Sequence, residues 1–123
     1  RITPWRMVYL PDLDQTDALD AEPNLVTDPN NPLLRVQACP GVSGCAQATV
    51  ETRELARDLV RDVPLATDLH VSGCAKGCAR RSASALTLVG RAGSFDLVRD
   101  GAAWDEPLRR GIDPLRVSDI IDG

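Results

Sequence analysis

The sequence predicts an α+β domain in which helices pack on a mixed β-sheet. Strands are expected at residues 34–38, 68–72, 85–91 and 94–99, which are short apolar or alternating segments. The last two are separated only by Ala92 and Gly93, which is typical of a β-hairpin. Residues 46–62 carry apolar side chains at the spacing of an amphipathic helix. We therefore expect one sheet with this helix on one face.

The N-terminal region is expected to contain few regular elements. A strand is predicted at 7–10, after the breaker Pro4. Residues 11–32 are rich in Asp, Asn and Pro, which is typical of a linker, and a short helix is expected around 16–21.

The central helix is the longest predicted element. It should face the sheet through Leu55, Leu59 and Val63, which follow the i, i+4 rule. Three arginines follow the same spacing on another side of this helix, which we interpret as its solvated face; they are Arg53, Arg57 and Arg61. Pro64 ends the helix, and a last helix is expected at 114–121.

Length and composition indicate one globular domain with a core, together with part of another. The chain has 123 residues, of which 43% are hydrophobic. No apolar run approaches the ~20 residues that a membrane span needs. Arg1 begins a strand-like segment and no leader is visible, so we expect a cytoplasmic protein. The chain does not begin with Met, and we therefore expect it to be part of a longer protein.

The charge balance argues against binding to nucleic acid or to a membrane surface. The net charge is −4, and aromatic residues make up 3% of the chain, too few for base-stacking platforms. The basic residues are nearly all arginine, with Lys76 as the single lysine. Arginine supplies planar forks that suit carboxylates.

Four cysteines form two pairs, Cys39-x5-Cys45 and Cys74-x3-Cys78. Three interpretations compete. Two disulfides would suit a small secreted domain, but this chain is large enough to bury a core without them. Structural zinc usually has ligands two to four residues apart, so the x5 pair would be unusual. A 4Fe–4S cluster needs four thiolates spread around a large body, and wider spacings allow that.

The neighbours of the cysteines favour the cluster. Glycines that permit close backbone approach lie in both loops; they are Gly41, Gly44, Gly73 and Gly77. Pro40 directly after Cys39 stiffens that turn. Each pair follows a predicted strand, and the first leads into the predicted helix, whose N-terminus would favour negative charge.

These motifs resemble a known superfamily. The spacing C-x5-C…C-x3-C in this setting is similar to the 4Fe–4S half of the nitrite and sulfite reductases. The segments ACPGVSGCAQA, LHVSGCAKGCAR, LTLVGR and TPWR look most like the precorrin-3B synthase family, over most of the chain and over the C-terminal part of such proteins. The resemblance implies a nitrite/sulfite reductase 4Fe–4S domain-like fold at 31–123. It also implies that residues 1–30 are the end of a ferredoxin-like half-domain and a linker.

The resemblance also implies roles for individual residues. The four matching cysteines would hold the cluster; they are Cys39, Cys45, Cys74 and Cys78. Cys78 corresponds to the thiolate that bridges to siroheme iron in the reductases. Lys76 stands where those reductases have Asn, Arg80 matches an arginine that binds macrocycle carboxylates, and Arg81 stands where they commonly have Pro.

The implied activity is that of an oxygen-dependent synthase that converts precorrin-3A to precorrin-3B by hydroxylation and lactone formation. Its partners would be the tetrapyrrole substrate, dioxygen, an electron donor and the missing N-terminal half of the same protein, without which we expect no activity. Candidate substrate-binding residues are Lys76, Arg80, Arg81 and Arg6. The catalytic residues are unknown, and an additional iron or siroheme is left open. The alternatives are a siroheme nitrite or sulfite reductase and a non-enzymatic zinc-stabilised module.

Other polar and aromatic residues are expected to have structural roles. His70 is the single histidine and is expected in strand packing or at the surface rather than on a metal. Trp5 and Trp104 are expected to pack. Solvated carboxylates are expected at Asp96, Asp100 and Asp105.

Overall fold

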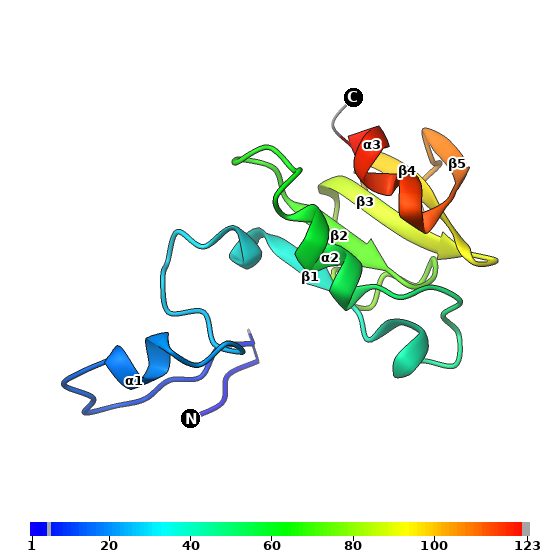
Figure 1. Ribbon diagram of the computed structural model, residues 1–123. Helices are drawn as coiled ribbons and strands as arrows, with labels where there is room; N and C mark the ends of the chain where they lie inside the picture. Colours follow the sequence, from blue (N-terminus) through cyan, green and yellow to red (C-terminus); the bar gives the residue numbers. More distant parts are fainter. Residues whose placement is uncertain (5, 122–123) are drawn as a thin grey trace. The chain divides into compact units, whose positions relative to one another are not determined.

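The computed structural model describes residues 1–4 and 6–121 (Figure 1), and Trp5 therefore lies outside the described residues. The chain divides into two compact units, Arg1–Asn31 and Pro32–Gly123. Among the described helices, none combines the length and the apolar character that a membrane crossing requires.

The first unit has little regular structure. Its helix α1 (Asp17–Asp20) confirms the one expected around 16–21. The strand predicted at 7–10 is wrong, since Val8 forms only an isolated bridge with Ile2. No described side chain of this unit is buried, so an apolar strand here has neither a sheet nor a core to join.

The second unit contains one five-stranded sheet in the order β1-β2-β3-β4-β5. Its strands are β1 (Val36–Ala38), β2 (Leu69–Ser72), β3 (Ser84–Arg91), β4 (Ser94–Gly101) and β5 (Arg109–Ile112). The first three are parallel and the last three antiparallel, which confirms a mixed sheet. The first strand is shorter than predicted because a 3₁₀ helix, η1 (Pro32–Arg35), occupies its start.

The hairpin between β3 and β4 follows from its two-residue turn. Ala92 and Gly93 both have positive φ, at 48° and 79°, as the turn between right-twisted strands requires. Arg91 and Ser94 close the ladder on either side. The amide of Gly93 also donates to Thr49 Oγ1 at 2.9 Å, which ties the tip to the segment after the first cysteine loop.

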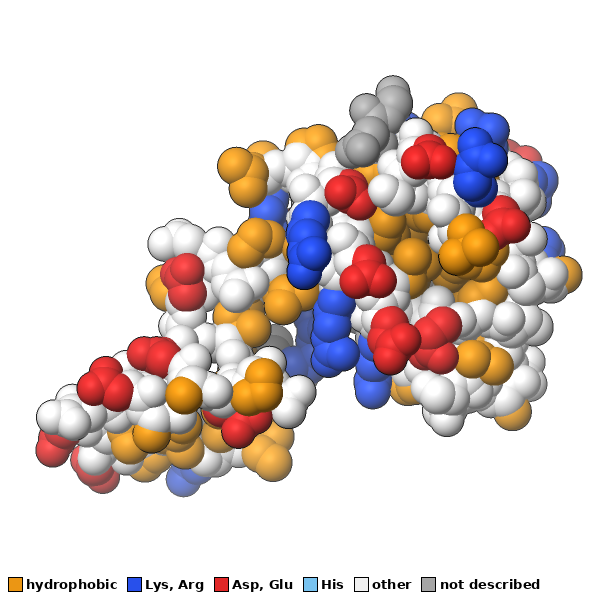
Figure 2. Space-filling model, viewed as in Figure 1, with side chains coloured by type: hydrophobic (Ala, Val, Ile, Leu, Met, Phe, Trp, Pro, Cys, Tyr) orange, Lys and Arg blue, Asp and Glu red, His pale blue; other side chains and the backbone are white. Residues whose placement is uncertain are grey.

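One face of the sheet carries the main hydrophobic core. Leu69, Val71 and Leu88 are fully buried there. Helix α2 (Arg53–Leu59) packs against this face, as predicted, through Leu59 and the partly buried Leu55. The arginine stripe is exposed, also as predicted, and Figure 2 shows basic side chains gathered over α2 with acidic ones beside them.

Helix α2 is shorter than the predicted 46–62 because the preceding segment folds as a loop. Val50 is buried and its carbonyl accepts from the amide of Val42 at 3.0 Å. Thr52 is fully buried and turns its hydroxyl toward the first cysteine loop. β-Branched residues are weak helix formers, and these two are held by contacts that a helix would break.

Two C-terminal elements complete the sheet and its cover. The helix expected at 114–121 is present as η3 (Pro114–Arg116) followed by α3 (Val117–Ile121). Asp113 begins it by accepting from the amide of Leu115 at 2.9 Å. Strand β5 was not predicted, because an arginine-rich edge strand with Gly111 at φ 66° lacks strand alternation.

The second face of the sheet is also covered. Val89, Val98 and Ala103 form a small apolar cluster there. Polar side chains are buried on the same face, among them His70 and Thr87, which are in register on β2 and β3. Strand alternation therefore separates an apolar layer from a partly polar one.

Candidate cluster-binding site

The two cysteine loops leave the sheet at the same edge. Cys39 directly follows β1, and Cys74 follows Ser72, the last residue of β2. These strands are parallel neighbours, so their carboxyl ends lie together. The amide of Cys39 donates to the carbonyl of Val71 at 3.3 Å, which joins the start of one loop to the end of the other strand. The two cysteine loops therefore begin at the same end of the sheet, and the second runs back toward the entry of β2, where Arg80 contacts Asp68.

Cys39 is held from two sides. Its Sγ accepts a hydrogen bond from the amide of Gly73 at 3.1 Å, across the two loops. Its carbonyl accepts from Thr52 Oγ1 at 2.5 Å. A Cβ on Gly73 would lie 2.7 Å from Ala48 Cβ and 3.3 Å from Cys39 Sγ, so the close approach requires glycine. An amide aimed at a cysteine sulfur is the contact expected to stabilise a thiolate.

The other three cysteines are more accessible. Cys45 and Cys74 are half-buried and Cys78 is exposed, and all four are free thiols. Within residues 1–4 and 6–121, no three His, Cys, Asp or Glu side chains are gathered closely enough to hold a metal ion between them. The helix-dipole expectation is not met either, because α2 begins only at Arg53 and not directly after Cys45.

The residues nevertheless fit a 4Fe–4S cluster in donor type. Four free thiols lie on two loops that follow adjacent strands, and the sulfur of Cys39 already accepts a hydrogen bond from the amide of Gly73. Such a cluster spreads its thiolates around a large body, so the thiols need not touch each other beforehand. Four thiols also suit zinc, which the fold does not distinguish from iron.

Arg80 anchors the end of the second cysteine loop inside the protein. Its Nε donates to Ala83 O at 3.0 Å, and its Nη1 reaches Gln37 Oε1 at 3.1 Å and Asp68 Oδ2 at 3.4 Å. Only 24% of its side chain is exposed. These contacts tie the loop to β1 and to the entry of β2, so the guanidinium is largely engaged by the protein.

The other predicted substrate-binding residues differ in their surroundings. Lys76 and Arg81 are exposed on the second cysteine loop and directly after it. The guanidinium of Arg81 lies over the indole of Trp104, with Cζ 5.8 Å from the ring centroid. Arg6 is exposed in the first unit, at φ 59°.

His70 is buried in β2. The sequence left open whether it packs within a strand or lies at the surface, and the structure shows strand packing. Its side chain is fully buried, and neither ring nitrogen has a hydrogen-bond partner among the described residues. Burial, and secondarily the positive charge of Arg80, lowers the pKa of His70 to about 4. The ring is therefore neutral near pH 7.

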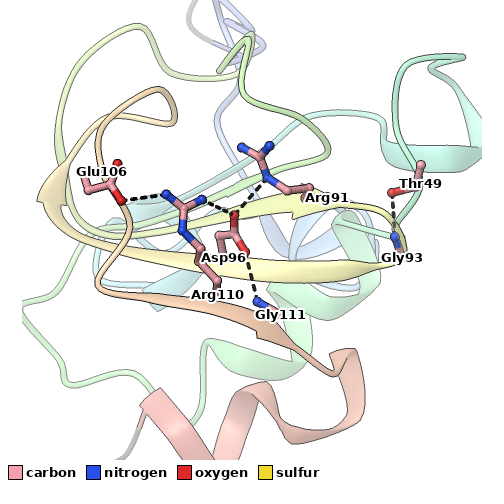
Figure 3. A network of polar contacts seen from close by, with 7 residues as sticks. All are labelled: Thr49, Arg91, Gly93, Asp96, Glu106, Arg110 and Gly111. Atoms are coloured by element: carbon pink, nitrogen blue, oxygen red, sulfur yellow. Dashed lines mark hydrogen bonds and ion pairs between the residues drawn. The ribbon is translucent and has the colours of Figure 1, made fainter.

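Asp96 was predicted to be solvated, and this was wrong. It is buried on β4, where Arg91 Nε lies 3.0 Å and Arg110 Nη1 3.5 Å from its Oδ2 (Figure 3). Its Oδ1 accepts from the amide of Gly111 at 3.0 Å. The carboxylate thus fastens β5 to the hairpin; the sequence signal was an acidic residue between Phe95 and Leu97 with arginines near by.

Two residues that contact the cysteine loops were not predicted from the sequence. Thr52 and Gly90 both contact the loops, although neither lies in a cysteine motif. A Cβ on Gly90 would lie 2.3 Å from Val50 Cγ2 and 2.5 Å from the carbonyl oxygen of Gly73. The strand β3 therefore passes directly beneath the second cysteine loop, a contact that pairing of β2 with β3 creates and that spacing alone does not reveal.

Comparisons with known proteins show what the chain is similar to. No family model matches the chain. It is 46% identical over 80 residues to a precorrin-3B synthase of Sinorhizobium sp., covering 62% of this chain and 17% of that protein. It is 35% identical over 75 residues to a coenzyme F420-dependent sulfite reductase of Methanocaldococcus jannaschii, covering 56% of this chain and 12% of that protein.

A solved structure has the same fold. The Mycobacterium tuberculosis NirA protein superposes with a TM-score of 0.60 and 24% identity, over 87% of this chain and 24% of that chain. The matched part of the chain covers less than a fifth of the length of each curated relative, the precorrin-3B synthase and the sulfite reductase. The chain is thus similar in sequence to a precorrin-3B synthase and to a sulfite reductase, and it shares the fold of the NirA protein.

Proposed function

We propose that the chain is the cluster-bearing part of an oxidoreductase of the precorrin-3B synthase type. Such an enzyme uses dioxygen to convert precorrin-3A to precorrin-3B, by hydroxylation and lactone formation, in aerobic cobalamin biosynthesis. The observation that carries the proposal is the pairing of two cysteine loops at adjacent parallel strand ends, in a chain 46% identical to such a synthase. Dioxygen, an electron donor and an N-terminal half of the same cytoplasmic protein would be its partners.

The four cysteines are the proposed ligands of a 4Fe–4S cluster; they are Cys39, Cys45, Cys74 and Cys78. When bound, the cluster supplies one-electron transfer. Cys39 is fixed in advance by the amide of Gly73, whereas Cys78 is exposed. Cys78 would therefore be the ligand most accessible to a substrate or to the rest of the complete enzyme.

The basic residues divide into two roles in this proposal. Lys76 and Arg81 are exposed and can pair with substrate carboxylates through charge-assisted hydrogen bonds. Arg80 contributes mainly by holding the loop that presents them, because its guanidinium already has three protein acceptors. Arg6 belongs to the first unit and is the remaining candidate for a carboxylate contact.

A siroheme-dependent sulfite or nitrite reductase is the second candidate. It is favoured by the 35% identity to a sulfite reductase. Lys76, in the place of the reductases' Asn, is the feature that favours the synthase. A siroheme absorption band in the complete protein would decide for the reductase.

Substitutions in the complete protein test the proposal. Lys76→Ala should raise the dissociation constant for the precorrin about tenfold, as loss of one charge-assisted contact predicts, without changing iron or sulfide content. Cys78→Ser should instead lose the cluster. If Lys76→Ala binds the precorrin as tightly as the parent protein, this loop does not contact the substrate.

A further inference from the structure

Trp104 lies half exposed against the second cysteine loop. The residue is 52% exposed, whereas large aromatic residues are usually highly buried. A Cβ added to Gly77 would lie only 3.2 Å from Cζ3 of Trp104. Gly77 separates Lys76 from Cys78 in the sequence, so the indole rests on the backbone between a proposed substrate contact and a proposed ligand.

Arg81 extends this surface. Its guanidinium is 5.8 Å from the centroid of the Trp104 ring, within the range of a cation–π contact. Neither Lys76 nor Arg81 forms an ion pair with a described carboxylate. The surface therefore combines an accessible aromatic ring with two cations that are not neutralised by the described side chains around them.

We propose that Trp104 and Arg81 form a contact for the polycarboxylate macrocycle that the enzyme takes as substrate. The exposed part of the indole packs on the apolar body of the tetrapyrrole, while Arg81 pairs with a peripheral carboxylate. The cation–π contact holds the guanidinium ready for that carboxylate, so less side-chain freedom is lost on binding. This inference rests on the proposed function and adds Trp104, a residue that the sequence indicated only as packing.

Single-stranded nucleic acid also presents ring systems and negative charge, so it is the alternative ligand for the surface formed by Trp104 and Arg81. The chain has a net charge of −4 and 3% aromatic residues, which disfavours it. A nucleic acid is therefore included in the test as a competitor.

Binding of a model tetrapyrrole to the whole chain tests the inference. The probe is coproporphyrin, a polycarboxylate, and its fluorescence anisotropy is titrated with the parent chain and with Trp104→Leu, Trp104→Phe and Arg81→Gln. Arg57→Gln is the matched control, since Arg57 is exposed on α2, which covers the opposite face of the sheet from Ala103. A cationic porphyrin serves as the charge-reversed ligand.

We expect Trp104→Leu and Arg81→Gln each to weaken coproporphyrin binding about tenfold. Trp104→Phe should weaken it less, Arg57→Gln should leave it unchanged, and the cationic porphyrin should not compete. The inference is overturned if the parent chain does not bind coproporphyrin, if Trp104→Leu binds like the parent, if Arg57→Gln has the effect of Arg81→Gln, or if a single-stranded oligonucleotide displaces the probe. Failure of the proposed function would appear separately, as a purified chain without iron and sulfide.

Discussion

His70 is fully buried with both ring nitrogens unpartnered within the described part of the chain, an arrangement that native proteins rarely tolerate. The neutral ring is the less costly form to bury, because burial disfavours the charged imidazolium and, secondarily, because that charge would lie close to Arg80. His70 therefore loses a proton on folding when the pH lies between about 4 and 6.5.

Stability should fall as the pH falls through the range between the two pKa values of His70. The unfolded pKa is 6.5 and the folded pKa about 4, so the unfolded state binds more protons in that window. We expect the free energy of unfolding to be about 2 kcal/mol lower at pH 5 than at pH 7 from this residue. Urea denaturation of the metal-free chain measures it.

His70→Leu is the control for this pH dependence. The apolar side chain removes the titrating group and leaves no unpartnered nitrogen, so its unfolding free energy should depend less on pH between 7 and 5. An equal loss in the parent and in His70→Leu would show that other groups carry the dependence.

Thr52 is also fully buried, and its hydroxyl donates a hydrogen bond to the carbonyl of Cys39. Thr52→Val keeps the shape but leaves that carbonyl without its donor, which should cost ~1–3 kcal/mol of stability. It should also speed alkylation of the buried Cys39 thiol. Thr52→Ser should restore both properties towards the parent values; if Thr52→Val and Thr52→Ser behave alike, the hydroxyl does not hold the loop.

Strand β3 passes close under the start of the second cysteine loop. Gly90 allows this, because any Cβ there would clash with Val50 and with the carbonyl of Gly73. A clash against backbone cannot be relieved by a side-chain rotation, so loop and strand would have to separate.

Gly90→Ala should therefore lower the free energy of unfolding by ~1–3 kcal/mol and make Cys74 react faster with alkylating reagents. Gly93→Ala is the matched control, since it strains a positive φ but meets no atom within 4 Å. Thermal unfolding and mass spectrometry of alkylated Cys74 give the two readouts. Equal reactivity of Cys74 in the two variants would mean that Gly90 does not support the loop.

For the whole molecule, the elements that depend on local pattern were predictable. The hairpin turn at Ala92 and Gly93, the packing face of α2 and the two cysteine loops all follow from spacing and turn chemistry. The strand at 7–10 was wrong because no neighbouring strand pairs with it beyond one bridge. The start of α2 was wrong because Thr52 hydrogen-bonds a residue distant in sequence.

The candidate site was predictable in composition but not in detail. Cysteine spacing predicted the four thiols as ligands, and this stays a prediction; the anchoring of Arg80 depends on Gln37 in β1 and on Asp68 directly before β2, which local spacing does not reveal. The exposure of Trp104 beside Gly77 depends likewise on the packing of residues far apart in the sequence. Such contacts are decided by tertiary packing, which local patterns do not encode.

Iron and sulfide analysis of the anaerobically purified chain tests the central claim most directly. The proposal that Cys39, Cys45, Cys74 and Cys78 hold a 4Fe–4S cluster predicts about four irons and four sulfides per chain, and loss of both in Cys39→Ser and in Cys78→Ser. A single zinc without sulfide, or iron retained in full by both serine variants, would contradict it.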